Sequence, residues 1–163
     1  MKRITIIGGG FSSLSAACYL AQKGFKVEVY EKQSTVGGRA RQYKKDGFVF
    51  DIGPTWYWMP DIFEKFFNDF GKRPSDYYSL ERLEPAYKVV FGKDDALTIP
   101  GTTEEIIKVF ESREKGAGNK LRKFLDNAAY NYDVAINDIV YRPGKSPFEL
   151  VSHKTIPKVG LFL

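Results

Sequence analysis

The order of apolar and polar residues predicts a strand, a helix and a second strand over residues 3–31. The run RITII is rich in β-branched side chains and predicts a short strand that is buried on both faces. The next segment, FSSLSAACYLAQKG, has small and apolar residues at helical spacing, with Gly24 at the position of a C-terminal cap. KVEVYE then alternates with the period of a strand. The pattern therefore predicts a β–α–β unit.

Beyond residue 31 the pattern predicts glycine-rich turns, helices and a hairpin. Two turns, TVGGRA and KKDG, surround the apolar run FVFDIG. Asp61 precedes Glu64 by three positions, so we expect a capping box to open a helix that stops at Gly71. The later elements are a hairpin around Lys93–Asp95, a helix from a second capping box at Thr102 and Glu105 to about Lys115, and a long helix with an apolar stripe from Leu121 to Ile139.

Composition and charge narrow the class of protein. The chain is 43% hydrophobic and 15% aromatic, which is typical of a globular protein. The net charge of +5 is spread over interleaved acidic and basic residues, so we do not expect nucleic-acid binding. Cys18 is the only cysteine and His153 the only histidine, so we expect no disulfide within the chain and no metal site.

The chain also lacks the apolar segments that direct a protein into or across a membrane. Its first apolar run is too short for the core of a signal peptide, and no run approaches the roughly 20 apolar residues that span a bilayer. Together with the single cysteine, which fits a reducing compartment, this predicts a cytoplasmic protein.

The glycines after the first strand indicate a cradle for the pyrophosphate of a dinucleotide. In IIGGGFSSLSAACYL, Gly8 permits the turn out of the strand and Gly10 lets a pyrophosphate approach bare backbone. The helix that begins there offers unpaired N–H groups to the phosphates. Ser13 stands where the usual motif has a third glycine, and we expect only a small local shift. Glu31, placed 21 residues beyond Gly10, can accept hydrogen bonds from ribose hydroxyls, which a purely structural turn would not explain.

A second glycine pair indicates which dinucleotide binds. Gly37 and Gly38 expose backbone N–H groups just past the second strand, and Arg39 can neutralise pyrophosphate charge. A turn with no ligand is the alternative interpretation of this pair. Combined with the cradle, the pair favours FAD, and the carboxylate of Glu31 disfavours the 2′-phosphate of NADP.

The spacing of Gly8, Gly10, Ala17, Gly24 and Glu31, followed by VGGRA and GFVFDIGPTW, resembles the amino-terminal region of bacterial phytoene desaturases. These flavoproteins are FAD-dependent carotenoid desaturases related to the flavin amine-oxidase superfamily. The resemblance implies an α/β fold with a Rossmann-like, NAD(P)-binding-like FAD-binding start. It also implies an oxidoreductase of carotenoid biosynthesis that removes two hydrogens from adjacent carbons of a polyene precursor such as phytoene.

The resemblance further implies roles for the positions that match the motifs. Those expected to bind the cofactor are Gly8, Gly10, Phe11 and Ser12 at the pyrophosphate, Glu31 at the adenosine ribose, Gly38 and Arg39 along the cofactor, and Gly53, Pro54 and Thr55 near the flavin. Thr35 departs from the pattern, because many superfamily members have an arginine there, and this weakens one phosphate contact.

The family implies further protein beyond this chain. Its members are longer and carry a second FAD-contacting segment near the C-terminus, which is not found here. The predicted sheet also needs more strands, and the chain stops inside the apolar run VGLFL. We therefore expect an amino-terminal fragment, inactive alone, with residues 1–60 as the first part of an FAD-binding domain. Residues 61–163 would begin a mixed α and β domain that faces substrate and membrane.

Candidate substrate contacts are aromatic. Trp56, Tyr57 and Trp58 follow the motif expected near the flavin and do not follow helical period. The phenylalanines of the helix after residue 61 fit either a core or a pocket for a polyene. We name no catalytic residue: Asp51 fits a turn-forming carboxylate better than a base, and His153 fits a surface residue. A hydrocarbon substrate implies peripheral contact with the inner face of a membrane through apolar surface.

Two other functions remain open at this point. One is a flavin amine oxidase-like dehydrogenase that acts on a polar substrate. The other is a non-catalytic nucleotide-binding domain that keeps the cradle without a complete flavin site. The aromatic residues and the stretch DIGPTW favour the carotenoid desaturase over the first.

Overall fold

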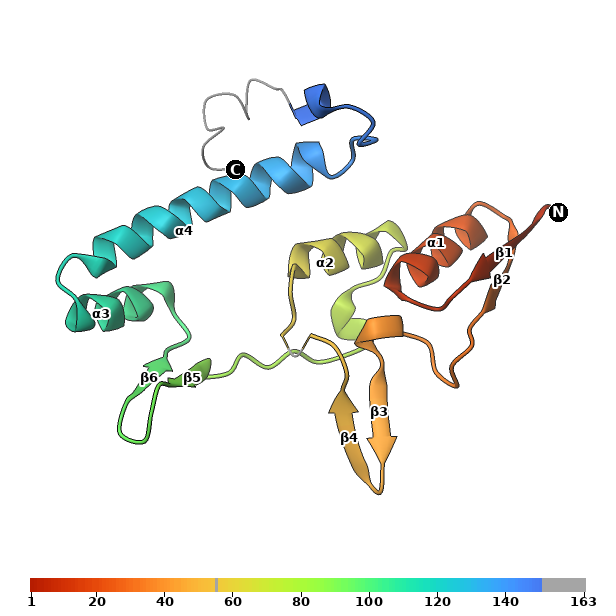
Figure 1. The fold of residues 1–163 in the computed structure, drawn as a ribbon. Helices are drawn as coiled ribbons and strands as arrows, with labels where there is room; N and C mark the ends of the chain where they lie inside the picture. Colours follow the sequence, from red (N-terminus) through yellow and green to blue (C-terminus); the bar gives the residue numbers. More distant parts are fainter. Residues whose placement is uncertain (55, 151–163) are drawn as a thin grey trace. The chain divides into compact units, whose positions relative to one another are not determined.

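The computed structural model of the chain describes residues 1–54 and 56–150. The chain divides into two compact units, Met1–Leu80 and Glu81–Leu163. The first unit thus extends past residue 60, where the sequence placed a domain boundary. That boundary stays a prediction. Figure 1 shows the elements of each unit in chain order.

The first unit begins with the predicted β–α–β arrangement. Strand β1 (Arg3–Ile7) and strand β2 (Lys26–Tyr30) are parallel, with Ile6 beside Val29, and helix α1 (Phe11–Gln22) connects them. After α1 the chain turns at Gly24, whose φ is +83°. The backbone N–H groups of Gly24 and Phe25 donate to the carbonyl groups of Ala21 and Leu20, as in a Schellman motif. The predicted C-terminal cap is therefore confirmed.

The burial predicted for both faces of the first strand is wrong in the described part of the chain. Ile4 and Ile6 are half-buried on one face, but Arg3, Thr5 and Ile7 are exposed on the other, and Ile7 is 88% exposed. The described residues give β1 a single neighbouring strand, β2, and α1 packs on this sheet. One helix covers only one face, so the β-branched sequence forms a strand whose second face stays open.

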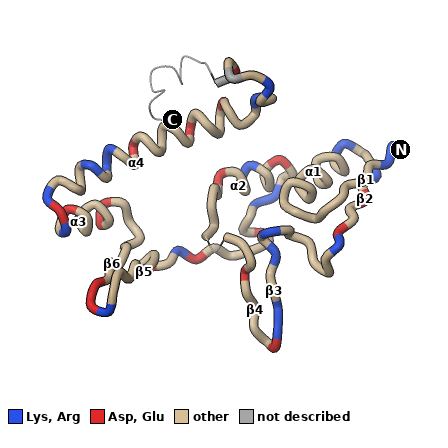
Figure 2. The backbone as a smooth tube through the Cα atoms, in the orientation of Figure 1, with Lys and Arg blue, Asp and Glu red and all other residues tan. Residues whose placement is uncertain are grey.

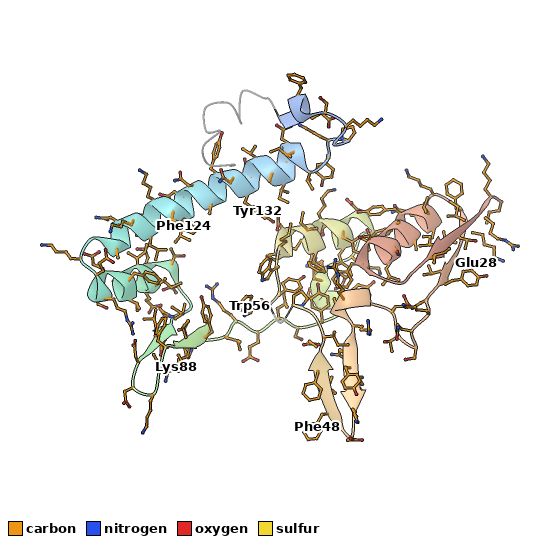
Figure 3. The ribbon with its side chains drawn as sticks, viewed as in Figure 1. Glu28, Phe48, Trp56, Lys88, Phe124 and Tyr132 are labelled. Carbon is orange, nitrogen blue, oxygen red and sulfur yellow. The ribbon has the colours of Figure 1, made fainter. Side chains whose placement is uncertain are left out.

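A hairpin follows, with strands β3 (Gln42–Lys45) and β4 (Phe48–Asp51). Its turn residues Asp46 and Gly47 both have positive φ, 51° and 83°, which is the geometry of a type I′ turn. The sequence predicted this turn and the apolar run after it, but not β3, because QYKK has no apolar alternation. Both strands are exposed along their length, including Phe48, which Figure 3 labels.

Helix α2 (Pro60–Asp69) packs against α1. The ring of Tyr19 lies 5.8 Å from that of Phe66 and 5.1 Å from that of Phe70, and its hydroxyl donates to Asp69 Oδ2 at 2.6 Å. These contacts favour the core interpretation of the phenylalanine face. Phe67 adds a contact with the ring of Tyr77, 4.9 Å away.

The capping box predicted at Asp61 is wrong. Met59 is the N-cap residue of α2, with φ 55° and ψ 56°, and among the described residues no side chain makes a cap hydrogen bond to this helix. Pro60 occupies the first helical position, where its fixed φ suits a helix and its missing N–H has no partner to lose. The helix therefore begins one residue before Asp61, and Asp61 lies in its first turn.

The second unit contains the predicted hairpin and helices. Strands β5 (Tyr87–Val90) and β6 (Ala96–Ile99) pair antiparallel, and helices α3 (Thr103–Arg113) and α4 (Ala117–Val134) follow. Thr102 is the N-cap residue of α3, and its hydroxyl accepts from the N–H of Glu105, which confirms this helix start. A π-helical turn (Ala135–Ile139) continues α4, and a short 3-10 helix (Pro147–Leu150) ends the described part.

Charged groups hold the two helices of this unit together. Glu111 accepts hydrogen bonds from the N–H groups of Gly116 and Gly118 at 2.8 and 2.9 Å, and these bonds lower its pKa. Arg122 on α4 pairs with Glu104 on α3 at 2.7 Å. Figure 2 shows acidic and basic residues interspersed along the chain. Among the described residues, no helix combines the length and the hydrophobicity needed to span a membrane.

Candidate dinucleotide-binding site

The junction of β1 and α1 leaves backbone N–H groups available for an anion. Gly8 turns the chain with φ 95°, and its N–H donates to Tyr30 O at 2.7 Å. Gly10 is the N-cap residue of α1 in extended conformation. Within the described chain no side chain caps this helix, and its first turn contains no acidic residue. The positive end of the helix is therefore open to a phosphate group.

A hollow of about 840 Å³, here called the cradle cavity, lies over this helix start. It is lined by three segments: Gly10–Ser13, Gly37–Ala40, and Ile52 with Gly53 and Pro54. The structure thus brings together most positions that the sequence assigned to a cofactor: Gly10, Phe11, Ser12, Gly38, Arg39, Gly53 and Pro54. Gly8 and Glu31 do not line the cavity: the N–H of Gly8 donates to Tyr30 O, and Glu31 accepts from the N–H of Gly9, which precedes Gly10. Thr55 lies outside the described residues.

The second glycine pair crosses the cradle at close range. Gly37 N–H donates to Gly9 O at 2.7 Å, and Gly37 forms a parallel bridge with Gly10. A Cβ atom on Gly38 would lie 3.1 Å from the Cα of Gly10, and the φ of Gly38 is +59°. Bare backbone is therefore required for the crossing itself. Gly37 and Gly38 therefore allow the two backbone segments to cross closely, and they also line the cradle cavity.

Gly53 closes the cavity from the side of the hairpin. A Cβ atom at this position would lie 2.1 Å from the carbonyl oxygen of Arg39, which is far inside van der Waals contact. The N–H of Ile52 donates to Arg41 O at 3.2 Å and holds the same two segments together. The sequence placed Gly53 near the cofactor only through its resemblance to a family, and the structure adds a packing reason for the glycine.

The carboxylate of Glu31 holds the cradle loop in place. Its Oε2 accepts from Gly9 N–H at 2.6 Å and its Oε1 from Gln33 N–H at 2.8 Å. The N–H of Gln33 and then that of Gly9 lower the pKa of Glu31, and the positive charge of Arg41 adds to this. Each carboxylate oxygen has a further lone pair, so both could still accept from a ribose. The ribose contact stays a prediction.

Arg41 is a site residue that the sequence analysis missed. Its Nη1 donates to the carbonyl oxygen of Gly38 at 3.0 Å, which fixes the orientation of the glycine pair. Arg41 also lines a second hollow of about 700 Å³, to which Thr35 and Lys44 contribute. The only sequence signal is the second arginine in GGRAR, whose partner is a backbone atom that no spacing rule identifies.

The predicted substrate trio divides into two parts. The rings of Trp56 and Trp58 are stacked, with centroids 6.3 Å and planes 5° apart, and the two residues are 61% and 63% exposed. Tyr57 points the other way: its ring lies 4.8 Å from that of Phe63, and its hydroxyl lies 2.5 Å from the hydroxyl of Tyr78. Burial, followed by the bond to Tyr78, raises the pKa of Tyr57.

The two groups considered for proton transfer do not extend the site. Asp51 ends β4, where its Oδ1 lies 3.5 Å from Nε2 of Gln42 on the paired strand. The contact shown is with a side chain of the paired strand, so the turn-forming interpretation of this carboxylate stays a prediction. His153 lies outside the described residues. Among the described residues, no group of three or more His, Cys, Asp or Glu side chains could hold a metal ion.

Three features define a dinucleotide-binding domain of the Rossmann type: the parallel β–α–β unit, the uncapped start of α1, and Glu31 directly after β2. The family model described as NAD(P)-binding Rossmann-like domain matches residues 6–72. This match includes α2 and ends within the first compact unit.

The chain has carotenoid desaturases as homologues. It is 46% identical over 139 residues to carotenoid 3,4-desaturase of Haloarcula japonica, which covers 85% of this chain and 28% of that protein. It is 38% identical over 145 residues to 4,4'-diapophytoene desaturase (4,4'-diaponeurosporene-forming) of Staphylococcus aureus strain Newman, which covers 89% of this chain and 29% of that protein. The chain therefore spans less than a third of the length of these relatives.

Glu31 provides a test of the cradle loop that needs no ligand. We expect Glu31→Gln to destabilise the first unit at neutral pH, because an amide cannot accept at both ends and would direct an N–H group at one of the two backbone donors. The wild-type carboxylate has a lowered pKa, so its contribution is present above the unfolded value of about 4.3 and is lost as pH falls through the folded value. Urea unfolding across this pH range measures the difference.

The matched control is Glu28→Gln, which makes the same chemical change on β2. Glu28 lies 3.8 Å from Arg3 and 3.5 Å from Lys26 and makes exposed ion pairs of small effect. We expect stability in Glu31→Gln to depend less on pH than in the wild type, and Glu28→Gln to follow the wild type. Identical pH dependence in all three proteins would show that Glu31 does not hold the loop.

Proposed function

We propose that this chain is part of an FAD-dependent oxidoreductase that desaturates a carotenoid precursor such as phytoene. The observation that carries the proposal is the similarity of most of the chain to two carotenoid desaturases. The cradle cavity supports it independently, because most of the residues expected to bind the cofactor line one hollow. The activity belongs to the whole protein, and we expect the chain alone to be inactive.

The residues around the cradle cavity fit FAD. The open start of α1 and the guanidinium of Arg39 offer positive potential to a pyrophosphate, and Gly10 leaves room for it, since a Cβ there would meet nothing within 4 Å. The ionised carboxylate of Glu31 suits a ribose with free hydroxyls and repels a 2′-phosphate. Gly53 and Pro54 would lie at the flavin end, and Thr55 follows them in sequence.

Bound FAD would supply the capacity to accept hydride from an adjacent pair of substrate carbons. The chain itself would bind the pyrophosphate, orient the flavin end and present apolar surface to a hydrophobic polyene. Trp56 and Trp58 are exposed aromatic groups that follow the flavin-end residues within a few positions. A polyene of this kind dissolves in lipid, so we propose a cytoplasmic protein with peripheral contact to the inner face of a membrane, completed by the remaining C-terminal part.

Cofactor choice is the most direct test of this proposal. We expect the purified chain to bind FAD and to quench its fluorescence in a saturable titration, with NADP competing poorly because of the charge on Glu31. Calorimetric titrations with NAD and with NADP measure the affinities to be compared with that of FAD. A chain that refuses FAD but binds NAD would contradict the flavoprotein and favour a nucleotide-binding domain of another function.

A further inference from the structure

The stretch Ile52–Pro60 contains no charged residue and includes both tryptophans of the chain. It leaves the cradle cavity at Gly53 and Pro54 and leads into α2. Within it, Trp56 and Trp58 expose their stacked indole rings, and Figure 3 labels Trp56. We call these two rings the indole platform.

Tyr57 fastens the platform to the body of the unit. Its ring contacts the ring of Phe63, and its hydroxyl contacts the hydroxyl of Tyr78. Phe63 in turn meets the ring of Phe11 edge-on at 6.0 Å, and Phe11 lines the cradle cavity. Aromatic contacts thus run without interruption from the cavity, through Phe63, to the residue between the two tryptophans.

We propose that the indole platform is a binding site for a linear conjugated hydrocarbon chain, and that Tyr57 is a positioning residue which holds it through Tyr78. This inference rests on the proposed function and specifies where its substrate lies. Tyr57 therefore does not contact the substrate, in contrast to the sequence-based prediction for the trio.

The chemistry of the platform favours a polyene as the occupant. The two indole rings are stacked with their planes within 5° of each other, so an outer face of the stack is a flat, polarisable surface that suits a planar π-system without hydrogen-bonding groups. Trp56 follows Gly53 and Pro54 of the cradle cavity within three positions, so the platform lies close in sequence to the expected flavin end. A bilayer surface is the less suitable occupant, because the first two charged residues that follow are Asp61 and Glu64, with a single lysine, Lys65, after them, whereas anionic lipid attracts clusters of lysine and arginine.

The chain provides its own optical probe for this site. Trp56 and Trp58 are its only tryptophans, so intrinsic fluorescence at the tryptophan band reports the platform alone. The conjugated tetraene methyl parinarate, in dilute detergent, absorbs where tryptophan emits. We expect saturable quenching on titration, with methyl stearate, a saturated chain, displacing the probe poorly.

Variants separate contact from positioning. Trp58→Leu leaves Trp56 as reporter and should weaken the apparent affinity for the tetraene about five-fold, the loss expected for one aromatic contact. Tyr57→Phe and Tyr78→Phe each remove one hydroxyl of the pair, and each should weaken the apparent affinity for the tetraene several-fold. The double variant should lose no more affinity than either single variant, because both changes break the same contact. Tyr77→Phe, which removes the hydroxyl next to Tyr78 in sequence, is the matched control and should change nothing.

Two results would overturn the inference. One is non-saturable quenching, or equal affinity for the tetraene in Tyr57→Phe, Tyr78→Phe and wild type while circular dichroism shows all three folded. The other is shielding of the tryptophans from acrylamide by anionic vesicles that contain no polyene, which would identify a membrane contact instead. FAD binding is measured in the same samples: a wild-type chain that binds FAD but not the tetraene refutes the platform alone, whereas a wild-type chain that binds no FAD refutes the proposed function.

Discussion

Replacing Gly10 by valine is expected to abolish most FAD binding while the fold is retained. The Cβ of residue 10 would meet no atom within 4 Å, and the backbone has φ −78°, so a side chain fits there without strain. The same open space is the cradle cavity, however, and two methyl groups would stand where the pyrophosphate must approach the backbone. We expect the dissociation constant to rise at least about 100-fold, which corresponds to roughly 2.7 kcal/mol.

Flavin fluorescence quenching measures the affinity, and circular dichroism measures the fold. Gly92→Val is the control, because a Cβ at Gly92 also meets nothing within 4 Å but lies in the second unit. It should bind FAD as the wild type does. Unchanged affinity in Gly10→Val would place the phosphates elsewhere, and the proposed cofactor site would then be wrong.

Gly53→Ala is expected to damage both the fold and the site. The added methyl group would lie 2.1 Å from the backbone carbonyl oxygen of Arg39, an atom that cannot rotate away as a side chain can. Either β4 or the turn at Gly38–Ala40 must move, and overpacking of this kind costs about 1–3 kcal/mol of stability. The displacement would also alter the wall of the cradle cavity, so FAD affinity should fall together with the free energy of unfolding.

Urea unfolding with and without FAD measures both effects for Gly53→Ala. Gly92→Ala adds the same methyl group where the structure has room and should leave the unfolding midpoint unchanged. A Gly53→Ala protein with wild-type stability would show that the two segments do not pack as closely as the structure indicates. Gly10→Val is expected to lose FAD affinity while its stability is retained, whereas Gly53→Ala is expected to lose FAD affinity and stability together.

The parts of the fold that the sequence predicted depend on local rules. The turn at Gly8, the Schellman motif at Gly24 and the cap at Thr102 each involve atoms within a few residues of one another, so spacing is enough to find them. The cradle was found for the same reason. Its glycines, the helix start and Glu31 belong to one β–α–β unit with a fixed crossing distance.

The features that the sequence missed depend on contacts between distant segments. The partner of Tyr57 is 21 residues away at Tyr78, and the N–H of Gly9 meets a carboxylate 22 residues away at Glu31. The packing of α2 on α1 depends on Tyr19, which no helical period of residues 61–70 can indicate. Strand β3 was missed because its register comes from the Asp46–Gly47 turn and not from its own side chains.

Strand β1 has a practical consequence for work with this chain. In the described part of the chain it pairs on one side only, and Ile7 at its end is largely uncovered. An edge strand presents unpaired backbone N–H and C=O groups, which can pair with a strand of a second molecule. Crowded samples should therefore turn turbid over time, and dilute handling or a lysine introduced at Thr5, on the uncovered face, should keep the molecules apart.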